Sequence, residues 1–210
     1  MHCCYFWIRI LPASLRLAYL FSLPLALLSL PVLPGAVVAQ TGPDFDIIRQ
    51  KGLEAFDARQ YGQASEFFQR AYELQPYNDD VRYRLALSLI YQDPQRDRRS
   101  DHPFGEGASY QKDLARAVQL LKESVTVQER VEVRSSATGL RHFHLGVAYW
   151  FSGRADLALD SFRRSFRSDF TRTDALYNRI VILRQMGKTK EAQVATSEYL
   201  RMTSIEDLDD

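Results

Sequence analysis

Apolar side chains recur at the spacing of an amphipathic helix through nearly all of the chain that follows Asp44. Short polar turns separate these stretches. Almost none of them shows the strict alternation of apolar and polar residues that is typical of a half-buried strand. The pattern therefore predicts an all-α protein built from short antiparallel helices.

Glycine and alanine return at a fixed spacing within this pattern. Gly153 and Gly187 are 34 residues apart, and so are Ala158 and Ala192. A glycine adopts the left-handed conformation without steric cost, so it is suited to end the first helix of a pair. Small residues where two backbones approach, with a large ring such as Phe162 one turn away, allow the pair to pack closely. The spacing indicates that the same contact is rebuilt in each unit.

The same offsets recur in other parts of the chain. Counted from Gly146, they reach Ala158, Phe162 and Ser165, and counted from Gly52 they reach Ala64, Phe68 and Ala71. This arrangement resembles the tetratricopeptide repeat, a helix–turn–helix unit of about 34 residues. The resemblance implies a right-handed α-solenoid of about four repeats, in which each helix pair buries its apolar face by stacking on the next. The expected repeats are 45–78, 79–138, 139–172 and 173–206.

The second unit is longer than the others. Its helices are expected at 79–92 and 113–129, and the positions that should follow Ala86 at the usual offsets come 19 residues too late. We therefore expect an insertion at 92–110, which is rich in charge, glycine and proline. Loops of this length in compact domains are usually functional or disordered.

Residues 1–39 have the features of a secretory signal peptide. A basic start precedes the apolar run at 17–33, and Val37 and Ala39 provide small residues before a cleavage site. Prolines within the run disfavour a stable spanning helix. The alternative is an uncleaved membrane anchor, since the run approaches the thickness of a bilayer. A cleaved signal implies export, with the periplasm as the expected location.

Composition narrows the classes of function. The chain has 46% hydrophobic and 25% charged residues, a globular balance, and its net charge of +1 gives no electrostatic basis for binding nucleic acid. Both cysteines, Cys3 and Cys4, precede the apolar run, so the domain expected at 40–210 has no disulfide or thiolate metal site. We expect no cofactor, and membrane contact only through an N-terminal segment that is not cleaved.

Catalytic and metal-binding motifs are weak in this sequence. The string GKT at 187–189 lacks the earlier glycine and the preceding strand of a phosphate-binding loop. His142 and His144 project about 200° apart on a helix, so they do not chelate one ion together. We expect one of them at the surface and the other packed. No serine or threonine has a base at a recognisable spacing, and the chain is expected not to be an enzyme.

The first helices carry more apolar surface than one packed face requires. In FHLGVAYWF (143–151), Leu145, Gly146 and Tyr149 serve the contact within the unit, which leaves a second stripe. In tetratricopeptide proteins such positions line the concave groove that holds peptides or helices. The residues expected to form this groove are Tyr83, Ile90, Tyr91, Phe143, Trp150, Phe151, Tyr177 and Arg184. We expect its aromatic rings to be partly exposed, because tyrosine and tryptophan suit surfaces with one wet end.

These observations favour an exported protein-interaction module that binds a peptide or helix of a partner. The first alternative is a scaffold or assembly factor of an envelope complex, such as a pilus, a secretion system or outer-membrane assembly. An alternative of another class is an enzyme or metal-binding protein that uses the insertion. His102 would then act there with Asp101 and Glu106.

Overall fold

The computed structural model describes residues 43–92 and 108–206. The predicted signal peptide at 1–39 and most of the predicted insertion, including His102, lie outside the described residues. The described residues form eight helices and no strand, which confirms the all-α prediction. The helices are α1 (Pro43–Asp57), α2 (Tyr61–Leu74), α3 (Asp79–Tyr91), α4 (Ala108–Val131), α5 (Ser136–Phe151), α6 (Ala155–Ser168), α7 (Thr173–Gln185) and α8 (Thr189–Glu206).

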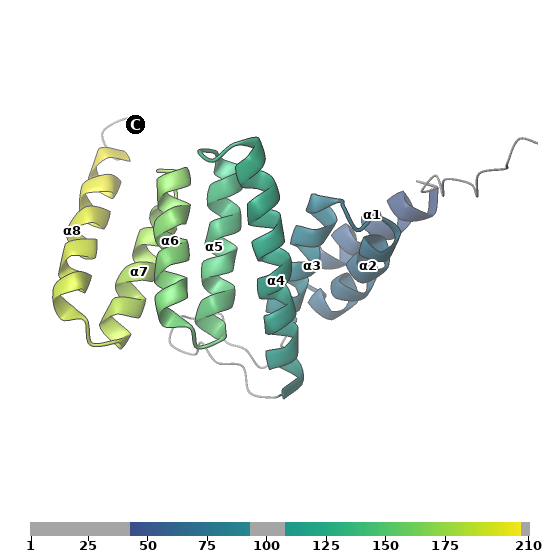
Figure 1. Ribbon diagram of the computed structural model, residues 1–210, viewed down its shortest axis with the longest axis horizontal. Helices are drawn as coiled ribbons and strands as arrows, with labels where there is room; N and C mark the ends of the chain where they lie inside the picture. Colours follow the sequence, from purple (N-terminus) through teal and green to yellow (C-terminus); the bar gives the residue numbers. More distant parts are fainter. Residues whose placement is uncertain (1–42, 93–107, 207–210) are drawn as a thin grey trace, which may run out of the picture. The chain divides into compact units, whose positions relative to one another are not determined.

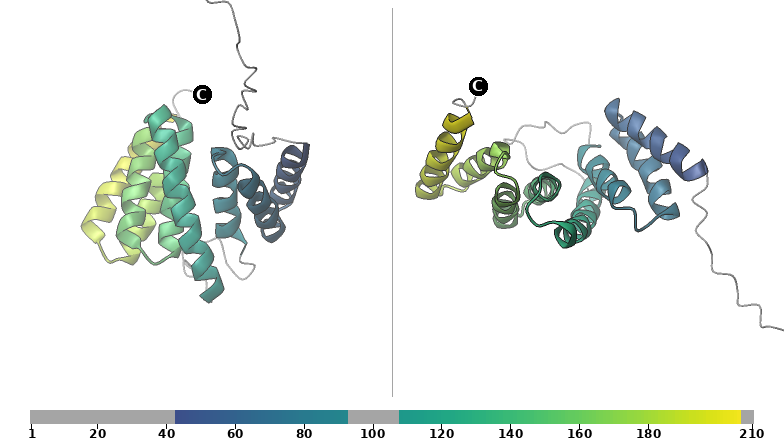
Figure 2. Two further views of the ribbon diagram at one scale, coloured as in Figure 1. Left: turned by 45° about the vertical axis from the view of Figure 1, so that its right-hand side comes forward. Right: turned by 90° about the horizontal axis from the view of Figure 1, so that it is seen from above.

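Consecutive helices pack against one another as antiparallel pairs, and each pair packs on the next. Turns within a unit therefore lie at one end of the helices and connections between units at the other. Figure 1 shows the α5–α6 and α7–α8 turns at one end and the α4–α5 connection at the opposite end. The further views in Figure 2 show α4, α5 and α6 side by side, as their contacts require.

The turns within units use the left-handed backbone conformation. Gly153 has a φ of 71° and Gly187 a φ of 70°, which confirms the role expected of these glycines. The first unit has Arg59 at the corresponding place, with a φ of 60°. An L-residue with a side chain is strained in this conformation, because its Cβ approaches the following carbonyl oxygen.

The helix pairs approach most closely where glycine faces a ring. A Cβ placed on Gly146 would lie 2.9 Å from Cε1 of Phe162, and one on Gly52 would lie 2.8 Å from Cε1 of Phe68. Both rings are almost fully buried. This geometry is the close contact that the repeat spacing predicts, so the assigned register is confirmed for the first and third units.

The first helices of the inner units begin with side-chain caps. The Asn78 side chain accepts a hydrogen bond from the Val81 N–H at 3.2 Å, and the Ser135 hydroxyl accepts one from the Thr138 N–H at 3.2 Å. Each cap satisfies a backbone donor that has no partner within its helix.

One hydrophobic cluster runs through the four units, from Ala55 in α1 to Ile182 in α7. The second helix of the long unit differs in extent from the prediction. It begins at Ala108 rather than 113 and ends at Val131 rather than 129. The residues that open α4 therefore belong to a helix and not to the predicted insertion.

Candidate partner-binding face

The eight predicted groove residues lie on first helices. Tyr83, Ile90 and Tyr91 are on α3, whereas Tyr177 and Arg184 are on α7. Phe143, Trp150 and Phe151 are on α5. We call the surface that these three helices carry along this stripe the first-helix face.

The expectation that the aromatic rings are partly exposed is wrong for three of them. Tyr83 is 9% exposed, Trp150 8% and Phe151 5%, and all three belong to the continuous core cluster. Ile90 is fully buried in the same cluster. These side chains are buried because the units stack along one core, so their first contribution is to stability.

The other predicted residues retain access to solvent. Tyr91 and Phe143 are half-buried, whereas Tyr177 is 54% exposed and Arg184 is exposed. The accessible part of the first-helix face thus lies toward α7. On the same face, Leu87 is buried and Val147 is half-buried.

Aromatic rings form a row of contacts from Phe56 on α1 to Phe143 on α5, edge-on except for the tilted Tyr61–Tyr91 pair. The Phe56 and Tyr61 rings lie 5.2 Å apart, and those of Tyr61 and Tyr91 lie 5.6 Å apart. The ring of His144 lies 6.5 Å from Tyr91 and 5.4 Å from Phe143. Edge contacts of this kind stabilise beyond the burial of area alone, and they fix the orientation of each ring.

His144 occupies the middle of the row and bonds to another unit. Its Nδ1 lies 2.7 Å from the Tyr83 hydroxyl and 3.0 Å from the Leu140 carbonyl oxygen. Burial lowers the pKa of His144 to about 4, so the ring is neutral near pH 7. Burial also raises the pKa of Tyr83 well above its usual value, and the phenol stays protonated. The pair is an uncharged link between α3 and α5.

Two arginines lie over the rings of the row. The Arg141 guanidinium is 4.8 Å from the centre of the Tyr83 ring, and that of Arg172 is 4.7 Å from the centre of the Phe143 ring. Arg141 donates to Asp79 at 2.8 Å, and Arg172 donates to Asp174 at 2.9 Å. Each guanidinium is held over its ring by an ion pair with a carboxylate.

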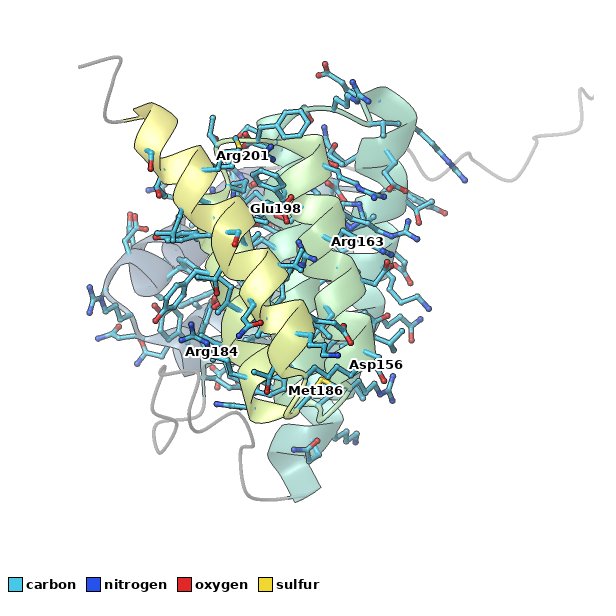
Figure 3. All side chains as sticks on the ribbon, turned by 90° about the vertical axis from the view of Figure 1, so that its left-hand side faces the viewer. Asp156, Arg163, Arg184, Met186, Glu198 and Arg201 are labelled. Carbon is cyan, nitrogen blue, oxygen red and sulfur yellow. The ribbon has the colours of Figure 1, made fainter. Side chains whose placement is uncertain are left out.

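The α7 end is the most open part of the face. The Tyr177 ring lies 6.1 Å from the ring of Tyr199 on α8, which supports it from one side. Figure 3 shows Arg184 on one side of α8 and Arg163 and Asp156 on the other. The first-helix face is thereby separated from the surface of the second helices.

The expectation of one surface and one packed histidine is wrong. His142 is 3% exposed, and its Nε2 lies 3.0 Å from a carboxylate oxygen of Glu129 on α4. Burial lowers the pKa of His142, and the hydrogen bond to Glu129 opposes this effect. The spacing of His142 and His144 could have predicted that both are packed. It places them on opposite sides of α5, and α5 has neighbouring helices on both sides. Among the described residues, no group of three or more His, Cys, Asp or Glu is placed to hold a metal ion.

Sequence reasoning missed a cleft between α6, α7 and α8, with a volume of about 420 Å³. Its floor includes Leu159 and Leu183, and charged side chains of both signs surround it. Lys188 pairs with Asp156 at 3.4 Å across the cleft. Positions on three helices converge there, and no single-helix pattern in the sequence marks such convergence.

Solved structures provide the comparison with known proteins. The chain is similar to MamA (41-end) from Desulfovibrio magneticus RS-1 with 13% identity and a TM-score of 0.61, covering 78% of this chain and 77% of that chain. Another crystal structure of MamA gives 16% identity and a TM-score of 0.54, covering 77% of this chain and 74% of that one. Neither the protein-family models nor the curated proteins give a match to the sequence.

The turn geometry recurs every 34 residues at Gly153 and Gly187, and the glycine–ring contact recurs in two units. The chain has the tetratricopeptide-repeat fold. The identities to solved structures are low, so the likeness concerns the fold and not the partner. Within this fold, the first-helix face combines a half-buried aromatic row with an open end at α7.

Proposed function

We propose that this chain is an exported protein-interaction module that holds a peptide or helical segment of a partner on its first-helix face. The observation that carries the proposal is the open end of this face, where the side chain of Tyr177 on α7 is 54% exposed. Exposed aromatic side chains bury large area at low entropic cost, and they are enriched among interface anchors.

The charges at this end favour a segment that carries a carboxylate. Arg184 is exposed, and it forms no ion pair with any residue in the described part of the chain. Arg172 is half-buried over the Phe143 ring, where it pairs with Asp174 and also interacts with the Asp169 carboxylate. A segment with an aromatic or aliphatic side chain next to Asp or Glu matches this combination.

The half-buried aromatic row supports such a site by fixing its shape before binding. Phe143 contacts both His144 and Phe162, with ring centres 5.4 Å apart in each case. Tyr177 is held against Tyr199. A surface whose anchors are already ordered loses less entropy when a partner binds.

Site-specific photocrosslinking tests the proposal. A photoreactive phenylalanine analogue replaces Tyr177 in the full chain, and the chain is produced in its native host. Tyr77, which is 94% exposed on the α2–α3 connection, is replaced in a matched control. We expect a discrete crosslinked protein from position 177 that is absent from position 77, and that is lost with Arg184→Glu. Equal crosslinking from both positions would refute the α7 site.

Export is a separate part of the proposal and has its own test. The apolar run at 17–33 and the small residues Val37 and Ala39 support cleavage after Ala39. Mass spectrometry of the chain from its host should find an N-terminus at Gln40. An intact N-terminus in membrane fractions would instead support an anchor.

A further inference from the structure

Exposed apolar side chains gather where the units are joined. Val131 at the end of α4 is 75% exposed, Val133 in the α4–α5 connection 60%, and Phe170 in the α6–α7 connection 55%. Both connections join successive units, so they lie at the same end of the helices. We call these three residues, together with Arg130, Arg134 and Arg167, the inter-unit tip.

The two connections are neighbours in space. The Ser136 side chain at the start of α5 lies near the carboxylate of Asp169 in the α6–α7 connection and favours its charged form. A Cβ on Gly139 of α5 would lie 2.7 Å from the Cβ of Asp169. Phe170 follows Asp169 directly, and Arg134 precedes Ser136 by two positions. The tip is therefore one surface rather than two separate loops.

The tip carries an excess of unpaired positive charge. Arg130, Arg134 and Arg167 are exposed, and none of them forms an ion pair within residues 43–92 and 108–206. Glu132 is the exposed carboxylate between them. Asp169 is half-buried and accepts hydrogen bonds from the Thr171 N–H at 3.0 Å and hydroxyl at 2.7 Å.

The geometry points to an anionic lipid surface as the ligand of the inter-unit tip. Projecting apolar side chains insert between lipid headgroups, and arginines beside them bind the phosphates. A protein partner more often docks into a concave pocket, and the 420 Å³ cleft contains none of the tip residues. No described helix is long and apolar enough to cross a membrane. This site is independent of the proposed partner site at α7.

Vesicle binding by the full chain tests the proposal. One set of vesicles contains equal parts of phosphatidylglycerol and phosphatidylcholine, and the other contains phosphatidylcholine alone. We expect cosedimentation with the anionic vesicles to be much stronger, and to weaken as salt screens the charges. Each arginine near an anionic surface contributes about a fivefold increase in binding, so Arg130→Gln, Arg134→Gln and Arg167→Gln together should weaken it roughly 100-fold.

A matched variant controls for net charge. Lys112→Gln, Arg154→Gln and Lys190→Gln together remove the same number of exposed cations from the opposite end of the helices. This variant should bind anionic vesicles nearly as well as the parent chain. All variants keep the same N-terminal segment, so it contributes equally to each measurement. Circular dichroism melts establish that each variant is folded.

A spectroscopic readout locates the contact. The Phe170→Trp variant places a fluorescent ring at the tip, and its emission relative to the parent should shift to shorter wavelength with anionic vesicles. Unshifted emission, or equal loss of binding in the two triple variants, would overturn the proposal. Binding to poly-L-glutamate without binding to anionic vesicles would overturn it as well, in favour of an acidic protein partner.

Discussion

Gly146→Ala isolates the contact on which the repeat register depends. The added methyl group would lie 2.9 Å from Cε1 of Phe162 and 3.0 Å from its Cδ1 and Cζ. Phe162 is 1% exposed, so its ring has little room to withdraw. Overpacking of this kind destabilises a protein by about 1–3 kcal/mol. Alanine is favoured over glycine inside a helix by about 1 kcal/mol, which offsets part of that loss.

We therefore expect Gly146→Ala to lower the free energy of unfolding by up to about 2 kcal/mol. Gly62→Ala is the matched control, because no atom lies within 4 Å of a Cβ built there. That change should raise the free energy of unfolding by about 0.5 kcal/mol. Urea denaturation followed by circular dichroism measures both values.

A second substitution tests whether the ring is the cause. In the Gly146→Ala background, Phe162→Leu should cost at least about 1 kcal/mol less than it does in the parent chain, because it removes the clash. Equal costs in the two backgrounds, or stabilisation by Gly146→Ala, would refute the assigned contact.

Three further changes test other features of the fold. Arg59→Gly should raise the free energy of unfolding in urea by about 0.5–1 kcal/mol, because glycine adopts a φ of 60° without strain. A lower free energy of unfolding would contradict strain at this turn. Stability should fall by up to about 3 kcal/mol between pH 6.5 and pH 4, because the unfolded chain takes up a proton near pH 6.5 and the folded His144 only near its pKa of about 4. His144→Phe should flatten that pH profile, and an unchanged slope would exclude His144 as its source. Trp150→Ala should lower the free energy of unfolding by about 3–5 kcal/mol, because the Trp150 side chain is only 8% exposed. A loss below about 1 kcal/mol would contradict the burial of Trp150.

The repeat period predicts the close contacts within units because those contacts repeat with it. Gly146 and Phe162 meet as expected, and Gly153 and Gly187 adopt the left-handed turn. The corresponding turn at Arg59 carries no glycine signal. It is found only by extending the register from the other units.

The repeat period does not predict whether the second apolar stripe of a first helix is buried or exposed. It places Trp150 and Phe143 on one side of α5, but their exposure depends on how far successive units overlap, which is a property of the stacked units. Trp150 is 8% exposed and Phe143 is half-buried. Likewise, His144 looks like half of a weak metal motif in sequence, and only the tertiary arrangement places it against Tyr83.

The last unit differs from the others at the positions that matter for a partner. Ile90 and Trp150 occupy one position of the stripe in the second and third units, and both are buried. The fourth unit has Arg184 there, and it is exposed. Arginine is almost never fully buried without a charged partner. An arginine at this position therefore agrees with a surface that is exposed to solvent in the free protein. The first-helix face therefore changes from core to accessible surface along its length, and a partner meets it most directly at α7.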